Sequence, residues 1–123
     1  MKTVSYSAVV VRLLVDQRQI KGIEQADMAA KLGLTPSSYS RLEAGHTALT
    51  VDMMFRMASI LNINIPQLMQ SAENVIRKFQ HTPGVEVAPI TRSNTIGNEQ
   101  NNGVAPFVTG AALGALIAAI LSK

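Results

Sequence analysis

Residues that start and stop helices recur at short intervals through the first 80 residues, and they restrict this part of the chain to short helices. Ser7 is suited to cap a first helix that runs to about Lys21, and Gly22 follows as a residue that tolerates positive φ. Later helical stretches are preceded by the capping residues Thr35, Thr50 and Asn64. Pro36 and Pro66 fall in first turns, where a missing N–H group costs nothing. The signals predict five helices, at about 8–21, 24–32, 36–44, 51–61 and 65–79.

Apolar residues repeat three and four positions apart within these segments, as expected for helices with one buried face. Met28 and Leu32 are four positions apart, and Tyr39 and Leu42 are three apart. The fourth segment carries the same pattern at Met54, Met57, Ala58 and Leu61. Aromatic residues make up only 4% of the chain against 47% hydrophobic residues in all, which favours an aliphatic helical core. The predicted fold class is all-α, with five helices around one core.

Several classes of chemistry lack the residues they need. The chain has no cysteine, which excludes disulfides and thiolate metal sites. The two histidines, His46 and His81, have no neighbours at metal-ligand spacing, and no nucleophile–base pair or phosphate-binding loop is visible. We therefore expect no metal, no cofactor and no enzymatic activity. The formal net charge of +3 suits a nucleic acid partner, although it equally suits an ordinary soluble protein.

The remainder of the chain differs in composition from the first 80 residues. The stretch 81–103 contains prolines, glycines and the polar run 98–102, which predicts a flexible linker. The stretch 104–121 has no charged residue and predicts a hydrophobic helix. The predicted organisation is a domain at 1–80, a linker at 81–103 and a hydrophobic helix at 104–123.

The hydrophobic helix contains a GxxxG motif, Gly110 and Gly114, which permits close approach of a second helix. Eighteen residues give about 27 Å of helix, close to the roughly 30 Å hydrocarbon core of a bilayer. The sequence therefore favours a membrane anchor through 104–121, with the preceding domain in the bacterial cytoplasm or nucleoid. Self-association of this helix in a soluble oligomer is the alternative.

An ordered set of residues resembles the Xre/Cro family of phage-repressor-like helix-turn-helix proteins. The matching residues are Arg18, Lys21–Ile23, Gln25, Met28–Ala29, Lys31–Gly33, Ser40–Gly45, Ala58, Leu61, Ile63 and Leu68. The resemblance implies a five-helix lambda-repressor-like domain whose third helix enters the major groove of DNA. It also implies a structural ion pair between Arg18 and Glu43.

The resemblance and the residue types together indicate a DNA-binding surface. Arg41 is the expected base-reading residue, since a guanidinium pairs with guanine O6 and N7. Ser37 and Ser38 are short enough to touch bases or phosphates. Helix starts at Gln25 and Thr35, and the loop residue His46, are expected to contact phosphates.

Some positions depart from the family pattern, namely Glu24 in place of a hydroxyl cap, Pro36 in place of a polar residue and Leu49 in place of a proline. A carboxylate at Glu24 would repel a nearby phosphate.

The leading hypothesis is a sequence-specific transcriptional regulator, a repressor that binds double-stranded DNA as a homodimer and is tethered by its tail. Either the fifth helix or the tail would supply the dimer contact. A membrane-tethered protein-interaction or antitoxin-like module that uses the same fold is the alternative.

Overall fold

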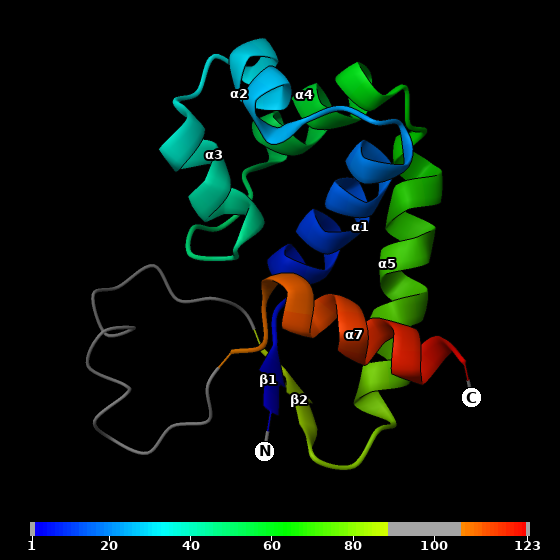
Figure 1. Ribbon diagram of the computed structural model, residues 1–123. Helices are drawn as coiled ribbons and strands as arrows, with labels where there is room; N and C mark the ends of the chain where they lie inside the picture. The colour runs from blue at the N-terminus through cyan, green and yellow to red at the C-terminus, as the bar shows by residue number, and fades with distance from the viewer. Residues whose placement is uncertain (1, 89–106, 123) are drawn as a thin grey trace.

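The computed structural model describes residues 2–88 and 107–122 of the 123-residue chain. Its elements are β1 (Lys2–Val4), α1 (Tyr6–Ile20), α2 (Gln25–Leu32), α3 (Pro36–Glu43), α4 (Val51–Leu61), α5 (Ile65–Gln80), β2 (Val85–Val87) and α7 (Gly110–Leu121). Figure 1 shows α2, α3 and α4 gathered at one end of the molecule, with the two strands and α7 at the other. Helix α1 runs between these ends, and the long helix α5 flanks it.

The predicted caps of α3, α4 and α5 are confirmed. The side-chain oxygens of Thr35, Thr50 and Asn64 each accept a hydrogen bond from the backbone N–H three residues further on. These bonds satisfy first-turn donors that have no partner within the helix. The predicted bounds of α4 agree with the structure, and those of α2, α3 and α5 differ from it by one residue.

The predicted cap of the first helix is wrong. Ser5, not Ser7, is the cap, and its Oγ accepts from the Ala8 N–H at 3.0 Å. Strand β1 holds Ser5 in the extended conformation that a capping residue needs, so the helix starts earlier. Ser7 lies in the first turn, where its Oγ accepts from the Leu49 N–H at 2.8 Å and ties α1 to the loop before α4.

The core is the shared apolar face of the helices, as the spacing of the apolar residues indicates. Its largest fully buried side chains, each less than 2% exposed, include Leu14 of α1, Met28 and Leu32 of α2, Tyr39 of α3, Met57 and Leu61 of α4, Phe79 of α5 and Leu113 of α7. One continuous cluster of buried residues therefore joins all of these helices.

A parallel pair of strands, which the sequence did not predict, closes the end of the molecule opposite α2 and α3 (Figure 1). Lys2, Thr3 and Val4 pair with Val85, Glu86 and Val87. Residues 85–87 fall inside the segment predicted as a flexible linker, so that part of the prediction is wrong. The stretch 89–103 of the predicted linker lies outside the described residues.

The C-terminal helix is shorter than predicted and packs on its own chain. It starts at Gly110 and has 12 residues, while Phe107 forms a β-bridge with Thr3 and the Val108 N–H donates to the Thr3 carbonyl at 2.7 Å. Residues 104–106 of the predicted helix lie outside the described part. Within the described residues, no helix combines the length and apolar character that a membrane span requires.

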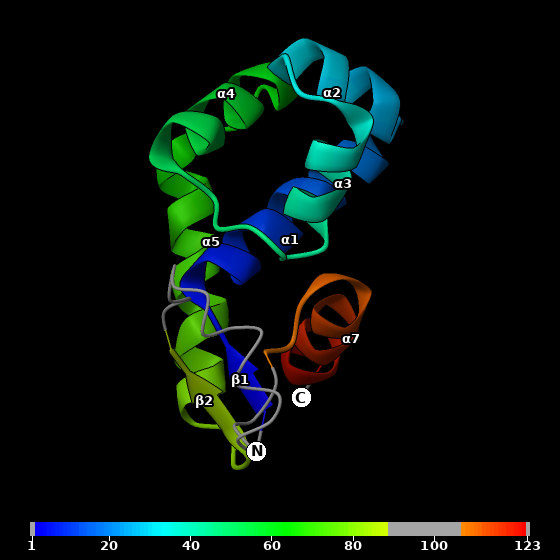
Figure 2. The ribbon, with the colours of Figure 1, turned by 90° about the vertical axis from the view of Figure 1, so that its left-hand side faces the viewer.

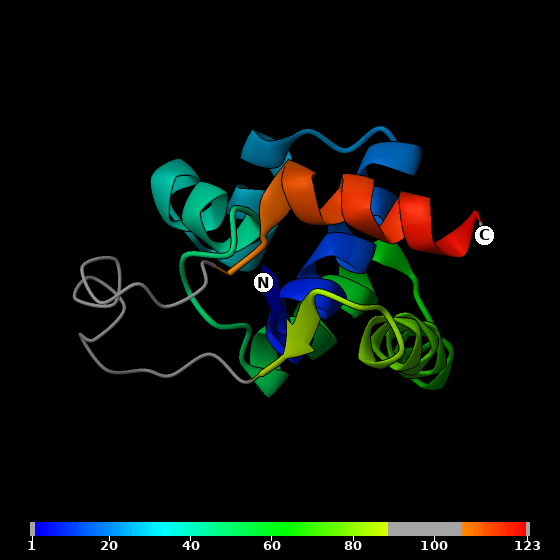
Figure 3. The same cartoon turned by 90° about the horizontal axis from the view of Figure 1, so that it is seen from below.

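Helix α7 buries one apolar face, Leu113, Ile117 and Ile120, against the core formed with α1 and α5. Figure 3 shows α7 lying across α1. The GxxxG glycines are also used within the chain. A Cβ added to Gly114 would lie 3.1 Å from Nε of Arg12, and one added to Gly110 would lie 3.9 Å from the Ala44 backbone. These residues, predicted to associate helices of separate molecules or in a membrane, thus bring α7 close to α1 and α3 of the same molecule.

Candidate nucleic-acid interface

A sharp turn places α3 against α2 (Figure 2). Gly33 ends α2 with φ +73°, a conformation that costs energy for residues with a Cβ. The Leu34 N–H then donates to the Ala29 carbonyl at 2.9 Å, which closes the helix end. Ala29 is 1% exposed. Its small side chain lies at the packed side of the turn.

The residues of α3 divide between two faces. Tyr39 and Leu42 are buried and hold the helix on the core. Ser37, Ser38 and Arg41 are exposed. Because α3 is anchored through its other side, these three side chains are presented outward from a helix whose orientation is fixed.

An ion pair fixes the end of α3 to the end of α1. Arg18 Nε donates to Glu43 Oε2 at 2.7 Å, and both side chains are 8% exposed. A second guanidinium nitrogen, Nη2, donates to Glu43 Oε1 at 3.2 Å, and Nη1 donates to the Ile23 carbonyl at 2.6 Å. The two-point geometry restricts rotation of the pair. The pair implied by the family resemblance is therefore formed, and it sets the position of α3 relative to α1.

Gln25 belongs to the same network. Its Nε2 donates to Glu43 Oε1 at 2.7 Å, which ties the start of α2 to the end of α3. The side chain is exposed, and one of its two amide N–H groups is used within the protein. The cap residue Glu24 makes no side-chain cap hydrogen bond. The first backbone N–H groups of α2 are therefore not bonded by the Glu24 side chain.

The hydroxyl groups at the start of α3 bond to one another. Thr35 Oγ1 accepts from the Ser38 N–H at 3.1 Å and donates to Ser38 Oγ at 2.9 Å, while Ser37 Oγ lies 3.5 Å from Thr35 Oγ1. All three residues are exposed. The Thr35 hydroxyl proton is therefore already donated within the helix start, whereas Ser37 keeps its hydroxyl nearly free.

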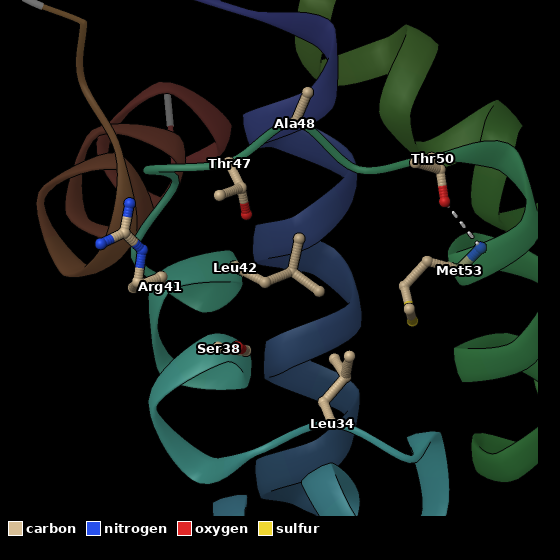
Figure 4. Close-up of a pocket in the computed structure, with 8 residues that line it drawn as sticks. All are labelled: Leu34, Ser38, Arg41, Leu42, Thr47, Ala48, Thr50 and Met53. Carbon is tan, nitrogen blue, oxygen red and sulfur yellow. Dashed lines mark hydrogen bonds between the residues drawn. The ribbon is translucent and has the colours of Figure 1, made fainter.

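Arg41 stands at the rim of a shallow pocket between α3 and the loop that follows (Figure 4). Figure 4 shows the guanidinium pointing away from the pocket, while Leu42 and Leu34 line its floor. In the described part of the chain Arg41 forms no salt bridge. Its charge is thus available to an external acceptor.

The loop after α3 adds residues to the same surface. His46 is exposed, and its backbone N–H donates to the Arg41 carbonyl at 3.0 Å. Thr47, also exposed, lines the pocket beside Ser38 and Arg41. Thr47 was not among the residues predicted to bind DNA. Its position directly after the predicted reading helix, in a polar loop, is the signal that could have identified it.

Burial changes the acidity of Tyr39 at the base of this surface. Burial and the nearby Glu43 carboxylate raise the pKa of the Tyr39 phenol well above its usual value. Its hydroxyl has no hydrogen-bond partner among the described residues. Tyr39 therefore acts as a core residue, in agreement with its place in the apolar pattern.

The six predicted DNA contacts, Gln25, Thr35, Ser37, Ser38, Arg41 and His46, all lie exposed on α2, α3 and the loops that flank α3. Two short helices joined by a glycine turn, with small polar and cationic side chains facing outward from the second, define the helix-turn-helix class.

Comparison with known families supports this class. Residues 14–68 match the family model described as helix-turn-helix. Residues 14–68 are therefore similar to the helix-turn-helix family, of the Xre-like type that the sequence resembles.

A solved structure shares the fold. It is a point mutant of the restriction-modification controller protein C.Esp1396I, with a TM-score of 0.53 and 22% sequence identity. The match covers 59% of this chain and 95% of that chain. At this identity the likeness shows the fold alone. No match to a curated protein was found.

Proposed function

We propose that the protein is a sequence-specific DNA-binding transcriptional regulator that reads duplex DNA with α3. The observation that carries the proposal is the division of α3, which buries Tyr39 and Leu42 and presents Ser37, Ser38 and Arg41 to solvent. The family and the fold support a DNA-binding regulator rather than an enzyme.

Each residue of the surface has a distinct proposed role. Arg41 donates to a guanine edge in the major groove, since its guanidinium is exposed and forms no salt bridge within the described residues. Ser37 and Ser38 contact bases or the near phosphates. The α2 start at Gln25 and the loop at His46 bind the flanking phosphates.

We propose that the protein acts as a repressor by occluding a promoter, in the bacterial nucleoid. The structural neighbour is a restriction-modification controller protein, which is compatible with a role in the control of gene expression. One reading helix with a single long side chain gives limited affinity, so two copies on adjacent half-sites are the expected arrangement.

The proposed homodimer needs an apolar surface that the fold leaves uncovered. The two elements favoured by the sequence, α5 and α7, bury their apolar faces within the chain. On α4, however, Val51 is 65% exposed and Phe55, one turn later, is 52% exposed. We propose that this pair contacts a second copy, because large apolar side chains gain most from removal from water.

Selection of bound duplexes from random DNA, with the full chain, tests the reading surface. Arg41→Ala should weaken binding of the selected duplex by about tenfold and relax its sequence preference, because a bidentate guanine contact is worth about 1–3 kcal/mol. The matched control is Lys2→Ala, which removes the same charge from an exposed position on β1, at the end of the molecule opposite α3. Equal behaviour of the two variants would contradict the assignment of Arg41.

Sedimentation of the full chain tests the dimer surface. Phe55→Glu should shift the protein toward the monomer, because a carboxylate cannot be buried in an apolar contact. Gln67→Glu, at an exposed position on α5, is the control. A monomeric wild-type protein at the concentrations that saturate DNA would refute the homodimer.

A further inference from the structure

A second cavity, remote from the reading helix, lies between the C-terminal ends of α5 and α7. It has a volume of about 510 Å³. The α5 side and the turn after it supply Arg77, Lys78 and His81, and the α7 side supplies Ile120 and Leu121. One wall is therefore basic and the other apolar, within the size range of about 300–1,000 Å³ that small-molecule sites occupy.

The basic wall carries charge that the chain does not neutralise. In the described part of the chain, the salt bridges are Arg12–Asp16 and Arg18–Glu43, and neither involves Arg77 or Lys78. Among the described residues, Arg77 Nη1 donates only to the neutral Asn74 Oδ1, at 3.2 Å. These two cations thus lack an acidic partner within the described residues, and an anion placed beside them would meet uncompensated positive charge.

The end of a helix normally repels an anion, because its last carbonyl groups point outward. Here two of those carbonyls, at Lys78 and Phe79, are already bonded. Thr82 Oγ1 donates to the Lys78 carbonyl at 2.6 Å, and the Thr82 N–H donates to the Phe79 carbonyl at 3.0 Å. The Thr82 side chain therefore reduces the unfavourable end charge at the floor of the cavity.

The apolar wall selects against a bare inorganic anion. Leu121 is 49% exposed, although it is a large apolar residue, and Ile120 beside it is 7% exposed. A ligand with a hydrocarbon portion would remove the Leu121 side chain from water and so gain affinity. The two walls together fit an amphipathic organic acid, with its carboxylate at Arg77 and Lys78 and its chain against α7.

The second end of α7 reaches the reading helix. A Cβ added to Gly45, which follows α3, would lie 2.5 Å from Cβ of Thr109, and Gly110 approaches the Ala44 backbone. Figures 1 and 3 show α7 spanning from this contact to the side of α5. A displacement of α7 at the cavity would therefore shift the contacts of Thr109 and Gly110 with the end of α3.

We propose that this cavity binds a small organic carboxylate with an aliphatic chain, and that occupancy alters DNA binding through α7. The site goes beyond the proposed function, and ligand binding does not depend on DNA. An experiment that measures ligand binding without DNA therefore distinguishes failure of the ligand site from failure of DNA recognition.

Calorimetric titration of the full chain with octanoate tests the site. We expect saturable binding of octanoate, and none of octylamine or inorganic phosphate at the same concentration. The double variant Arg77→Gln/Lys78→Gln should bind about tenfold more weakly, since charge-assisted hydrogen bonds are lost. The control variant Lys31→Gln/Arg56→Gln removes the same charge from exposed positions on α2 and α4 and should bind as the wild type does.

A second pair of variants tests the apolar wall without altering the cations. Leu121→Asn should weaken octanoate binding by about tenfold, because the apolar contact is lost. Ala119→Asn adds the same neutral amide to the exposed face of α7 and should leave binding unchanged. Absence of saturable octanoate binding, or equal binding by the Arg77→Gln/Lys78→Gln variant, overturns the site. Binding of phosphate as tight as that of octanoate overturns the amphipathic ligand.

The effect of ligand binding on DNA binding is measured as a change in DNA affinity. Saturating octanoate should change the affinity of the wild type for its selected duplex severalfold, and should leave that of the Arg77→Gln/Lys78→Gln variant unchanged. An unchanged wild-type affinity at saturating octanoate would overturn transmission through α7.

Discussion

At the scale of single residues, the end of α3 is held by a small group of polar side chains at its junction with α1 and α2. The resemblance to a known family implied the pair of Arg18 and Glu43, and both residues lie together in the structure. The third member, Gln25, was predicted to face DNA, but its amide donates to Glu43. Sequence spacing placed Gln25 correctly at the start of α2. It could not show which acceptor the side chain takes, because that depends on how α2 and α3 pack.

Tyr39→Phe tests the buried hydroxyl beside this group. The hydroxyl has no partner among the described residues, so its removal should raise the free energy of unfolding by about 1 kcal/mol or leave it unchanged. The folded state holds the phenol proton more tightly than the unfolded state, since the Tyr39 pKa is raised. Above about pH 10 the Tyr39 phenol ionises in the unfolded state while it stays protonated in the folded state. The free energy of unfolding of the wild type therefore falls as the pH rises above about 10.

Denaturant unfolding of both proteins from pH 8 to pH 11 measures this effect. The stability of the wild type should decline relative to Tyr39→Phe by up to about 1.4 kcal/mol per pH unit above pH 10. Tyr6→Phe, which removes a hydroxyl from a residue 52% exposed, is the control. Parallel stability curves for the wild type and Tyr39→Phe would contradict the prediction.

At the scale of elements, the helices were predictable and the sheet was not. Caps such as Thr35 and stops such as Gly33 act on residues a few positions away, so the sequence carries them locally. The strands have three residues each, and their partners lie more than 80 positions apart in the chain. No local pattern of that length specifies pairing. The sequence favoured a membrane helix for the tail for the same reason. The hydrophobicity of the tail is a local property of the sequence, whereas the core that covers it is formed by distant residues.

The contact between α7 and the turn after α3 can be tested at Gly45. Gly45→Ala combines a positive φ of 83° with a Cβ only 2.5 Å from Cβ of Thr109, and should lower the free energy of unfolding by about 2 kcal/mol or more. Gly84→Ala has nearly the same φ, +82°, with nothing within 4 Å, and should cost only about 1 kcal/mol.

Thermal unfolding of the two glycine variants gives the comparison. The double variant Gly45→Ala/Thr109→Gly should regain the extra free energy of unfolding that Gly45→Ala loses relative to Gly84→Ala, because the clashing Thr109 side chain is absent. If Gly45→Ala and Gly84→Ala lowered the free energy of unfolding equally, the contact between Thr109 and Gly45 would not contribute to stability.

At the scale of the whole molecule, α7 is an integral part of the core rather than an appendage. Its side chains Leu113, Ile117 and Ile120 are each no more than 7% exposed. The helix-turn-helix match ends at residue 68, so α7 extends the core beyond the matched domain. The site residues on α2 and α3 could be predicted from the sequence, whereas their support from the C-terminal segment required the fold.

Removal of residues 107–123 should therefore destabilise the domain. The free energy of unfolding should fall by roughly 3–6 kcal/mol, because the apolar surface of α1 and α5 beneath α7 becomes exposed to water. Chemical denaturation of the shortened and full chains provides the measurement. The variant Ala118→Ser, on the exposed face of α7, should unfold as the wild type does. An unaltered midpoint in the shortened chain would place α7 outside the core.

The pairing of β1 with β2 and of Thr3 with Phe107 has a consequence for synthesis on the ribosome. The partners of the β1 residues are made 83 to 104 residues later in the chain. In the order of the chain, α1 to α5 emerge before Phe107 and α7 do. We expect α3 to be in place early, and the assembly of the strands and α7 to be the last step, completed only as the C-terminal segment leaves the exit tunnel. A nascent chain arrested before that point would expose the apolar groove that α7 fills, and so would be a natural substrate for chaperones.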